Sequence, residues 1–275
     1  MRTGVQEYTN EQNQLHVLRL HYTADPAKRS AAWRTQESRN LPRRGWLREY
    51  EINWATPEGE PVVPEFSADL HVRSLTIHDD LRPLRFWDFG WVAPVVLFSQ
   101  LTMHDQLLVH RELSPFNTSL HVLWPMAESV TMNLFPKMKP FDAGDPAGEN
   151  QTDLGASAQY LAQKGVRLYS TRPGTEISYQ AIRNRFKRMI HIPNVGLEPA
   201  ILIDPRCRNL VDALTGAFHL TENPPYKPVK KHPFKDVVDA LRYGNDCLSL
   251  ERKDYQQALE QMASNDRIDT VGVYR

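Results

Sequence analysis

An acidic residue inside an otherwise aromatic and apolar run constrains this chain more than any other feature of its sequence. The run covers residues 84–91 and reads LRFWDFGW. Such runs are typical of buried strands. A buried carboxylate is costly unless a partner compensates its charge, and a metal ion is one such partner. Asp88 is therefore predicted to be a metal ligand on the first strand of a sheet, with Gly90 allowing close approach of a backbone or a ligand. The alternative is that Asp88 caps a turn at the strand end.

Three apolar runs with short breaks define the centre of the predicted fold. They cover residues 84–91, 93–100 and 106–113, and breaks of turn length predict an antiparallel meander. Helices are predicted at residues 117–134, 152–164, 175–190, 206–218 and 233–248, and further strands at residues 139–143, 166–170 and 199–203. This order predicts an α/β fold: an RNase H-like mixed sheet, made of an antiparallel meander plus parallel strands, flanked by helices. The meander argues against an all-parallel, doubly wound sheet.

The chain is expected to have three parts, namely a first segment over residues 1–60, a main domain over residues 61–250 and a helical tail over residues 251–275. In the first part, residues 1–14 are polar and expected to be frayed, residues 14–22 are predicted to form a strand, and residues 30–39 a short helix. A Pro- and Gly-rich connector, residues 55–83, is expected to wrap the main domain. An aromatic surface is predicted to pack within this chain; it comprises Trp46, Leu47, Tyr50, Ile52 and Trp54.

The charge balance limits how the chain can bind nucleic acid. Lys plus Arg total 33 and Asp plus Glu total 33. The net charge is therefore zero, and any nucleic-acid binding must use local basic patches. The only cysteines are Cys207 and Cys247, and the sequence shows no signal peptide, which predicts a reducing, cytoplasmic setting. No apolar run approaches the ~20 residues that a membrane span needs.

Four carboxylates stand where distant segments of the chain can meet. Asp88 ends the first strand, Asp145 lies in a Gly-Asp-Pro-Ala-Gly turn after a later strand, and Asp236 and Asp239 lie on the last long helix. The helical pair is spaced i, i+3 and shares one face. Oxygen-only ligands suit Mg²⁺ or Mn²⁺. Several carboxylates around a phosphate suit two such ions ~3.5–4 Å apart, so the sequence predicts a two-ion site.

Other acids compete for these roles. Asp142 flanks the same turn as Asp145 and is an alternative ligand. Asp204 also ends a strand, but it is expected to be the N-cap of the following helix. Asp246 lies two turns beyond Asp239 and is expected to be solvated. The sequence contains no His/Cys spacing typical of zinc and no defensible Ser-His-Asp arrangement.

Six segments, in a fixed order, carry a resemblance to a known family. They are residues 20–26 (LHYTADP), 46–52 (WLREYEI), 59–66 (GEPVVPEF), 86–90 (FWDFG), 145–148 (DPAG) and 239–243 (DALRY). In this order the chain resembles the C-terminal nuclease domain of the large terminase subunit of tailed bacteriophages. The resemblance extends over nearly the whole chain, to about residue 248.

The resemblance implies an RNase H-like endonuclease that cuts concatemeric viral DNA during genome packaging. It implies catalysis with Mg²⁺ or Mn²⁺ by an acidic triad, which maps onto Asp88, Asp145 and Asp239. Asp236 would be a supporting ligand, and Glu112, on the third strand, would support the site from behind the ligands. The implied partners are double-stranded DNA, a packaging ATPase, the portal and the small terminase, without a membrane. The implied location is the host cell cytoplasm.

One departure from the family is clear. The sequence contains no Gly-x-x-x-x-Gly-Lys-Ser/Thr loop that would hold the phosphates of ATP. We therefore expect no ATP hydrolysis by this chain. It is either part of a longer protein or a nuclease encoded apart from its motor, and residues 1–60 would be the junction that follows a packaging ATPase.

Three basic patches are candidates for DNA binding. They are a helical set (Arg183, Arg185, Lys187 and Arg188), a loop before the acidic helix (Lys227, Lys230 and Lys231) and a pair that precedes Asp145 (Lys137 and Lys139). Such patches bind the phosphate backbone without reading the sequence. The alternative is that they are solvated faces which only keep the protein soluble.

Two rival functions follow from the same residues. One is a different RNase H-like nuclease, such as a junction resolvase, which would prefer branched DNA. The other is a non-catalytic docking or DNA-clamp module, in which Asp88 would serve only the structure.

Overall fold

The computed structural model describes residues 3–9, 16–39, 46, 49–52, 59–90, 92–145, 155–221 and 227–251. Several sequence predictions fall outside these residues and are not tested: Leu47, Trp54, the turn residues 146–148 and the tail beyond residue 251. No helix in the described part of the chain is both long and apolar enough to cross a membrane.

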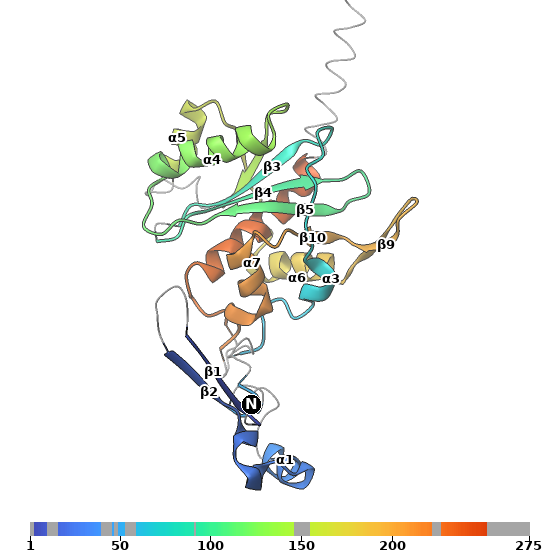
Figure 1. The fold of residues 1–275 in the computed structure, drawn as a ribbon. Helices are drawn as coiled ribbons and strands as arrows, with labels where there is room; N and C mark the ends of the chain where they lie inside the picture. The colour runs from blue at the N-terminus through green and yellow to red at the C-terminus, as the bar shows by residue number, and fades with distance from the viewer. Residues whose placement is uncertain are drawn as a thin grey trace, which may run out of the picture.

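A six-stranded mixed sheet forms the centre of the molecule (Figure 1). The strands β3 (Pro83–Asp88), β4 (Val95–Leu101) and β5 (Leu107–Leu113) pair as the predicted antiparallel meander. β6 (Phe141–Gly144) runs parallel to β3, β7 (Leu168–Tyr169) parallel to β6, and β10 (Ile201–Ile203) parallel to β5. The order across the sheet is β10-β5-β4-β3-β6-β7, so the predicted mixed sheet is confirmed.

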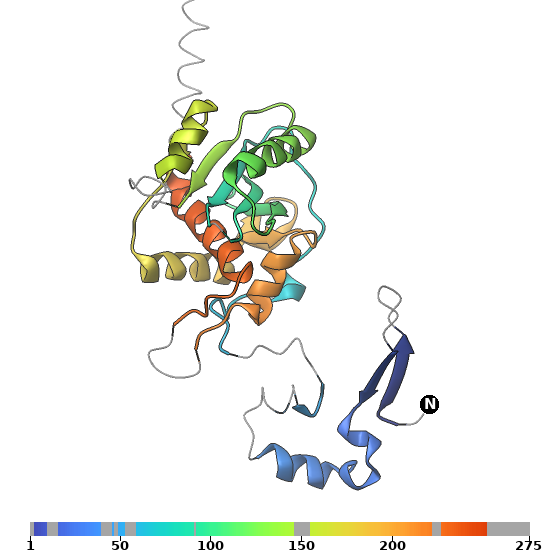
Figure 2. The same ribbon diagram turned by 90° about the vertical axis from the view of Figure 1, so that its left-hand side faces the viewer.

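Helices cover both faces of the sheet, as predicted. α4 (Leu120–Leu134) and α5 (Gly155–Gln163) lie on one face. The other face carries α6 (Thr175–Lys187), α7 (Arg208–Asp212) with the π-helical turn Ala213–Ala217, the short α3 (Ala68–His71) and a helix over residues 234–251, called here the 234–251 helix. Figure 2 shows this helix, coloured orange to red, next to the yellow α6.

β3 is buried on both faces, which explains its apolar sequence. Its side chains alternate between two cores, as strand geometry requires. Phe86 belongs to the core under the 234–251 helix, and Trp87 belongs to the core under α4. Gly244 brings the 234–251 helix onto the Phe86 ring, because a Cβ there would lie only 2.0–2.3 Å from three ring carbons. The end of β3 is thereby fixed against this helix.

The first part of the chain forms a small unit of its own (Figure 2). β1 (Val5–Thr9) and β2 (His16–Leu20) make an antiparallel hairpin, followed by two 3₁₀ turns and α1 (Ala31–Ser38). The expectation that residues 1–14 are frayed is wrong for residues 5–9, because β1 pairs with β2 along its whole length. The predicted aromatic packing is confirmed for Trp46 and Tyr50. Their rings pack against each other and against Tyr22 and Trp33, with centroids 4.6–6.2 Å apart.

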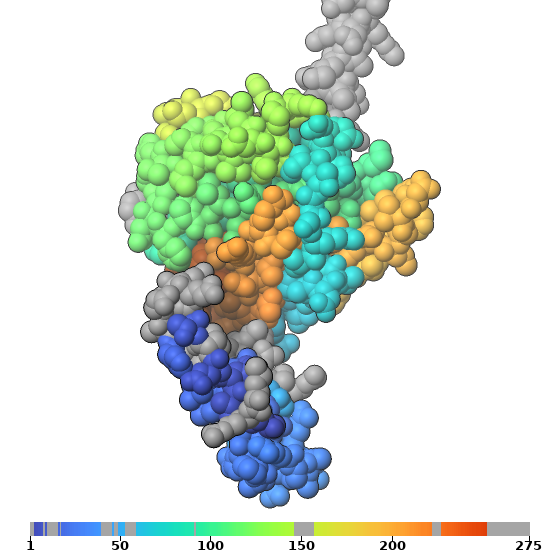
Figure 3. Space-filling model, in the orientation of Figure 1, coloured from blue at the N-terminus to red at the C-terminus, as the bar shows by residue number. Residues whose placement is uncertain are grey.

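Residues 59–82 connect this unit to β3 and run across the surface of the main domain, coloured cyan in Figure 3. Val62 and Val63 are buried in the core. The buried His71 ring is within hydrogen-bonding distance, 3.1 Å, of the Phe186 carbonyl of α6. Val72 forms a bridge with Ile203 of β10. The connector is therefore part of the folded domain and wraps it, as predicted.

Some element boundaries differ from the sequence predictions. The helix predicted to reach residue 190 ends at Lys187, and β8 (Met189–Ile192) and β9 (Gly196–Pro199) form a hairpin that projects from the molecule (Figures 1 and 3). Asn194 and Gly196 have positive φ angles, 64° and 110°, which make the hairpin turn possible. α4 starts at Leu120, later than the predicted residue 117, with Ser119 at its N-cap.

Candidate functional site

The C-terminal ends of β3 and β6 lie side by side. The strands are parallel, Trp87 is in register with Gly144, and the Asp145 backbone nitrogen donates to the Trp87 carbonyl at 3.3 Å. Asp88 and Asp145 each follow this register pair by one residue. Parallel pairing therefore brings two acids, 57 positions apart in the sequence, to one edge of the sheet.

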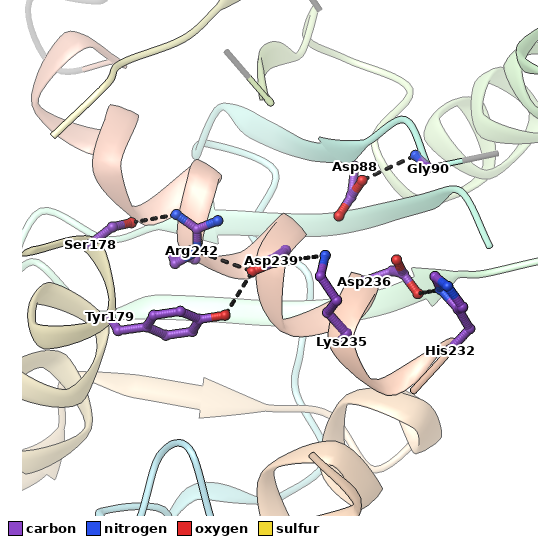
Figure 4. Close-up of polar contacts among 9 residues, drawn as sticks. All are labelled: Asp88, Gly90, Ser178, Tyr179, His232, Lys235, Asp236, Asp239 and Arg242. Atoms are coloured by element: carbon purple, nitrogen blue, oxygen red, sulfur yellow. Dashed lines mark hydrogen bonds and ion pairs between the residues drawn. The ribbon is translucent and has the colours of Figure 1, made fainter. Parts of the chain in front are cut away.

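The 234–251 helix adds two further acids at the same edge (Figure 4). Asp236 and Asp239 are both almost fully buried, at 2% and 3% exposure. Both carboxylates interact electrostatically with Asp88, as does Asp145. The structure thus brings together Asp88, Asp145, Asp236 and Asp239, the four acids that the sequence singled out.

The ionised form of Asp88 is strongly disfavoured within this acidic cluster. Burial, together with the like charges of Asp239, Asp236 and Asp145, raises the pKa of Asp88 to about 8. Lys235 opposes this shift only in part. Asp88 Oδ1 also accepts a hydrogen bond from the Gly90 backbone nitrogen at 3.1 Å, which is the turn-capping contact of the alternative interpretation. The capping role and a ligand role are compatible, because the second carboxylate oxygen takes no part in the turn.

Gly90 leaves a small space between two of the carboxylates. A Cβ at this position would lie 3.5 Å from Asp236 Oδ1 and 3.6 Å from Asp88 Oδ1. The two oxygens therefore face the same point, next to a backbone without a side chain. This is the close approach that the sequence suggested for Gly90.

Asp239 is held by three donors (Figure 4). Lys235 Nζ lies 2.5 Å from Oδ2, while Tyr179 donates to Oδ1 at 3.0 Å and Arg242 Nε donates to Oδ1 at 3.1 Å. Asp236 is paired with His232, whose Nδ1 lies 2.6 Å from Oδ2. Burial raises the pKa of Asp236, although His232 acts in the opposite direction.

The donor chemistry of the cluster fits a divalent cation. All four members are carboxylates, which Mg²⁺ and Mn²⁺ prefer, and the raised pKa of Asp88 means that its negative charge lacks sufficient compensation. The geometry is not yet that of a metal site: within the described ranges, no group of three His, Cys, Asp or Glu side chains is arranged to hold an ion. Lys235 already contacts one oxygen of Asp239, and His232 one oxygen of Asp236.

The described structure superposes on that of a bacteriophage large terminase. It matches a large terminase from a thermophilic bacteriophage with a TM-score of 0.55 and 14% identity. The match covers 86% of this chain and 56% of that terminase. The chain shares the fold of a large terminase. The resemblance inferred from the sequence motifs is therefore confirmed at the level of the fold, and the chain spans just over half the length of that terminase.

Two nuclease domains of large terminases also match. The large terminase nuclease from phage G20c, solved with bound magnesium, matches over 69% of this chain and 98% of its own, with 12% identity and a TM-score of 0.48. The nuclease domain from bacteriophage SPP1, solved with bound Mn, matches over 64% and 95%, with 15% identity and a TM-score of 0.42. No protein-family model matches the sequence, and no curated protein matches it.

Within this terminase fold, Asp142 lies away from the acidic cluster. Its carboxylate accepts from Arg85 Nε at 2.6 Å, from Arg85 Nη2 at 2.9 Å and from Trp87 Nε1 at 2.7 Å. Arg85 and Trp87 face the α4 side of β3, whereas Asp88 faces the opposite side by strand alternation. Asp142 therefore neutralises a buried arginine, and Asp145 is the acid of this turn that belongs to the cluster.

Three other acids have structural roles. Glu112 accepts from the backbone nitrogens of Asn209 and Leu210 at 2.7 and 2.9 Å, so it caps α7. Asp204 is not the N-cap of α7, a position taken by Cys207. Asp204 is paired with Arg206 at 2.7 Å and accepts from the Leu75 nitrogen at 2.9 Å. Despite burial, these bonds lower the pKa of Asp204 to about 2.

The expectation that Asp246 is solvated is wrong. It is half-buried and hydrogen-bonded to Ser178 of α6, and burial raises its pKa. Ser178 in turn accepts from Arg242 Nη1 at 3.1 Å. A polar chain therefore connects Asp246 through Ser178 and Arg242 to Asp239, and it joins α6 to the 234–251 helix beside the cluster.

The helical basic patch is neutralised within the chain. Arg183 and Lys187 both pair with Glu65, at 3.0 and 3.2 Å. Arg185 donates to Asn245 at 2.6 Å, and Arg188 pairs with Asp105. These four side chains hold α6 to its neighbours, and the hypothesis that they clamp DNA stays a prediction.

The lysines of the other two predicted patches lie at different ends of the sheet. Lys137 and Lys139 precede β6, whose first residue is in register with Leu84, four residues or about 13 Å before Asp88. Lys137 is also paired with Asp79 at 2.5 Å. By contrast, the exposed residues Lys227, Lys230 and Lys231 precede the 234–251 helix, which begins next to the cluster. Only this lysine loop adjoins the site.

Sequence reasoning missed the residues that contact the acids, namely Tyr179, His232, Lys235 and Arg242. Lys235 had a signal, because it precedes Asp239 by four residues on the same helix and so shares its face. His232 lies in the turn before the helix, four residues ahead of Asp236. Tyr179 had none, since it comes from α6, 60 positions away.

Proposed function

We propose that this chain is a metal-dependent DNA endonuclease with an RNase H-like fold, which cuts concatemeric viral DNA during genome packaging. The observation that carries the proposal is the convergence of four buried or half-buried carboxylates at one edge of a sheet. The fold shared with the large terminase of a thermophilic phage supports the packaging role. The oxygen-only donor set makes Mg²⁺ and Mn²⁺ the ions to test first.

In this proposal Asp88, Asp145 and Asp239 are the catalytic metal ligands, and Asp236 is a supporting ligand. Two bound Mg²⁺ or Mn²⁺ ions would supply an activated water and stabilise the leaving oxygen of the phosphodiester. The chain's own groups bind and orient: Gly90 leaves room at the Asp88 and Asp236 oxygens. Tyr179 holds the Asp239 carboxylate in a fixed orientation. Such positioning matters because the reacting atoms must be aligned.

The lysine loop would hold the DNA backbone next to the acids. Lys227, Lys230 and Lys231 are exposed. The Lys231 carbonyl accepts from the Lys235 backbone nitrogen at 3.0 Å, which connects the loop to the start of the helix. If Lys230 and Lys231 contact phosphates, replacing both by alanine should weaken DNA binding at every sequence and reduce its salt slope by about 1 per lysine. An unchanged slope would remove the loop from the proposal.

The wider assignment follows the same reasoning. We assign residues 61–250 to the nuclease domain, residues 1–60 to a junction that follows a packaging ATPase, and residues 251–275 to a C-terminal tail. The packaging ATPase, the portal and the small terminase would be the partners, in the host cell cytoplasm. Pure protein should hydrolyse no ATP, and measurable ATPase activity would contradict this assignment.

Plasmid cleavage tests the central proposal. Wild-type protein with Mn²⁺ should convert supercoiled plasmid to nicked and linear forms, and Asp88→Asn should abolish cleavage while the circular dichroism spectrum stays unchanged. Asp212→Asn is the matched control, because Asp212 is an acid on α7, outside the cluster. Equal cleavage by wild type and Asp88→Asn would overturn the proposal.

A non-catalytic DNA clamp is the second candidate, and one observation favours it. Both oxygens of Asp239 are already occupied by donors of the chain, and no three-residue metal group occurs in the part of the chain that is described. A clamp predicts DNA binding without cleavage in Mn²⁺, unchanged in Asp88→Asn. A junction resolvase predicts instead that four-way junctions are cut faster than linear duplex.

A further inference from the structure

Lys235 is placed unusually for a lysine. Its ammonium lies within the acidic cluster, 2.5 Å from Asp239 Oδ2, and its side chain is only 30% exposed (Figure 4). Asp88 and Asp236 also interact with it electrostatically. Three acids from β3 and the 234–251 helix thus share this one ammonium.

The ammonium supplies the positive charge that this arrangement needs. Buried carboxylates repel one another, and an ammonium among them offsets part of the repulsion. Tyr179 and Arg242 donate to Oδ1 of Asp239 and Lys235 donates to Oδ2, so both oxygens of this carboxylate already accept from groups of the chain. Lys235 therefore stands where a cation bound by Asp239 and Asp88 would have to approach.

We infer that Lys235 is a positioning residue that holds the metal-free cluster together and must withdraw from Asp239 when a divalent cation binds. The inference rests on the proposed function, because it assumes that the four acids bind such a cation. A lysine suits this exchange, since its four-carbon stem is flexible and its ammonium is a point charge. Its partial exposure gives the ammonium a path to solvent.

The exchange makes opposite predictions for the metal-free and metal-bound protein. Lys235→Met keeps much of the length of the side chain and removes the charge. In EDTA this variant should unfold at a lower temperature than wild type, because the acids lose their counter-charge. In isothermal titration with Mn²⁺ it should bind about tenfold more tightly, because no ammonium has to leave.

Lys235→Arg is the matched control, since it keeps the positive charge, and it should bind Mn²⁺ with the same affinity as wild type. An unchanged or weaker Mn²⁺ affinity in Lys235→Met would overturn the inference, because Lys235 would then be neutral towards the ion or help to organise its ligands. Circular dichroism in EDTA, run on each variant, shows whether the fold is retained.

Chemical labelling tests the same exchange in the unaltered protein. Acetylation of lysines, followed by mass spectrometry, should modify Lys235 several-fold faster in Mn²⁺ than in EDTA. The exposed Lys230 serves as the internal control and should react at the same rate in both. Equal rates for Lys235 in the two conditions would also overturn the inference.

The outcomes separate this inference from the proposed function. Wild-type protein that binds Mn²⁺ and cuts DNA, combined with an unchanged affinity in Lys235→Met, rejects only the role of Lys235. If neither protein binds Mn²⁺, both ideas fail. If Lys235→Met binds Mn²⁺ and wild type does not, the blocking role of Lys235 is supported.

Discussion

Asp88 carries an electrostatic penalty that substitution should relieve. Its pKa rises from an ordinary 3.8 to about 8 because of burial and the neighbouring acids. Between these pH values the folded state binds a proton that the unfolded state releases, so the stability of the metal-free protein falls as the pH rises from about 4 to 8.

Asp88→Asn should therefore stabilise the metal-free protein, even though it should abolish cleavage. At pH 8 in EDTA we expect its melting temperature to exceed that of wild type by about 4 °C or more, with a smaller difference at pH 5. Scanning calorimetry at both pH values measures this. A difference that does not grow with pH would mean that the charge of Asp88 is already compensated.

His110 is a second buried titratable group, outside the acidic cluster. It is 1% exposed, and neither ring nitrogen has a hydrogen-bond partner among the described residues. Burial, followed by the charge of His78, lowers the pKa of His110 to about 4. The unfolded state therefore binds a proton below about pH 6.5 that the folded state refuses, and stability is lost as the pH falls towards 4.

Replacing His110 by leucine should remove this acid sensitivity. We expect wild type to lose about 3 kcal/mol more than His110→Leu between pH 6.5 and pH 4 in urea denaturation. His16→Gln is the control, because the His16 side chain is 65% exposed, and it should follow wild type. Parallel pH profiles for wild type and His110→Leu would refute the expected role of His110.

At this scale the sequence identifies acids better than their partners. Asp88 is conspicuous because it interrupts an apolar run, and Asp236 and Asp239 because helical spacing puts them on one face. The choice between Asp142 and Asp145 depends on the face to which each side chain points, and this is fixed only by the pairing of β6 with β3. The donors that hold Asp239 depend likewise on tertiary packing.

Among the elements, the contact between the 234–251 helix and β3 decides where the helical acids lie. Gly244 touches the Phe86 ring so closely that any side chain there must push the helix away. Gly244→Ala should destabilise the protein by about 1–3 kcal/mol in urea denaturation. Phe86→Leu in the same chain should recover part of this loss, because it shortens the opposing side chain. Additive effects of the two changes would argue against this contact.

Periodicity predicts the elements whose burial is regular. The β3–β5 meander and α1 are where the sequence predicts them, because apolar runs and the Ser30 cap are local signals. β1 and the β8–β9 hairpin were missed. Their described residues are exposed or half-buried apart from Pro199, so the pairing of backbones, and not an apolar face, defines them.

On the scale of the whole molecule, the described core begins at Val62. Both clusters of buried apolar residues draw their members from residue 62 onwards, whereas the aromatic packing of Tyr22, Trp33, Trp46 and Tyr50 is confined to the first part of the chain. The main domain should therefore keep its stability without the first part.

A chain that begins at residue 59 should unfold at the same temperature as the full chain and bind Mn²⁺ with the same affinity. A chain that begins at residue 73 should be markedly less stable, because it lacks Val62, Val63 and the buried His71. Calorimetry of the two shortened chains measures this. Equal loss of stability in both would show that the first part is integral to the core.

The mixed sheet also places a buried ion pair on one face and the acidic cluster on the other. Arg85 and Trp87 point to the α4 face, where Asp142 neutralises the arginine, and Phe86 and Asp88 point to the face of the 234–251 helix. Deleting a single residue within β3 would turn the guanidinium towards the acids and the Asp88 carboxylate towards apolar packing. The number of residues in this strand is thus more constrained than the identity of most of them. A shift of one residue would disrupt both the core packing and the acidic cluster.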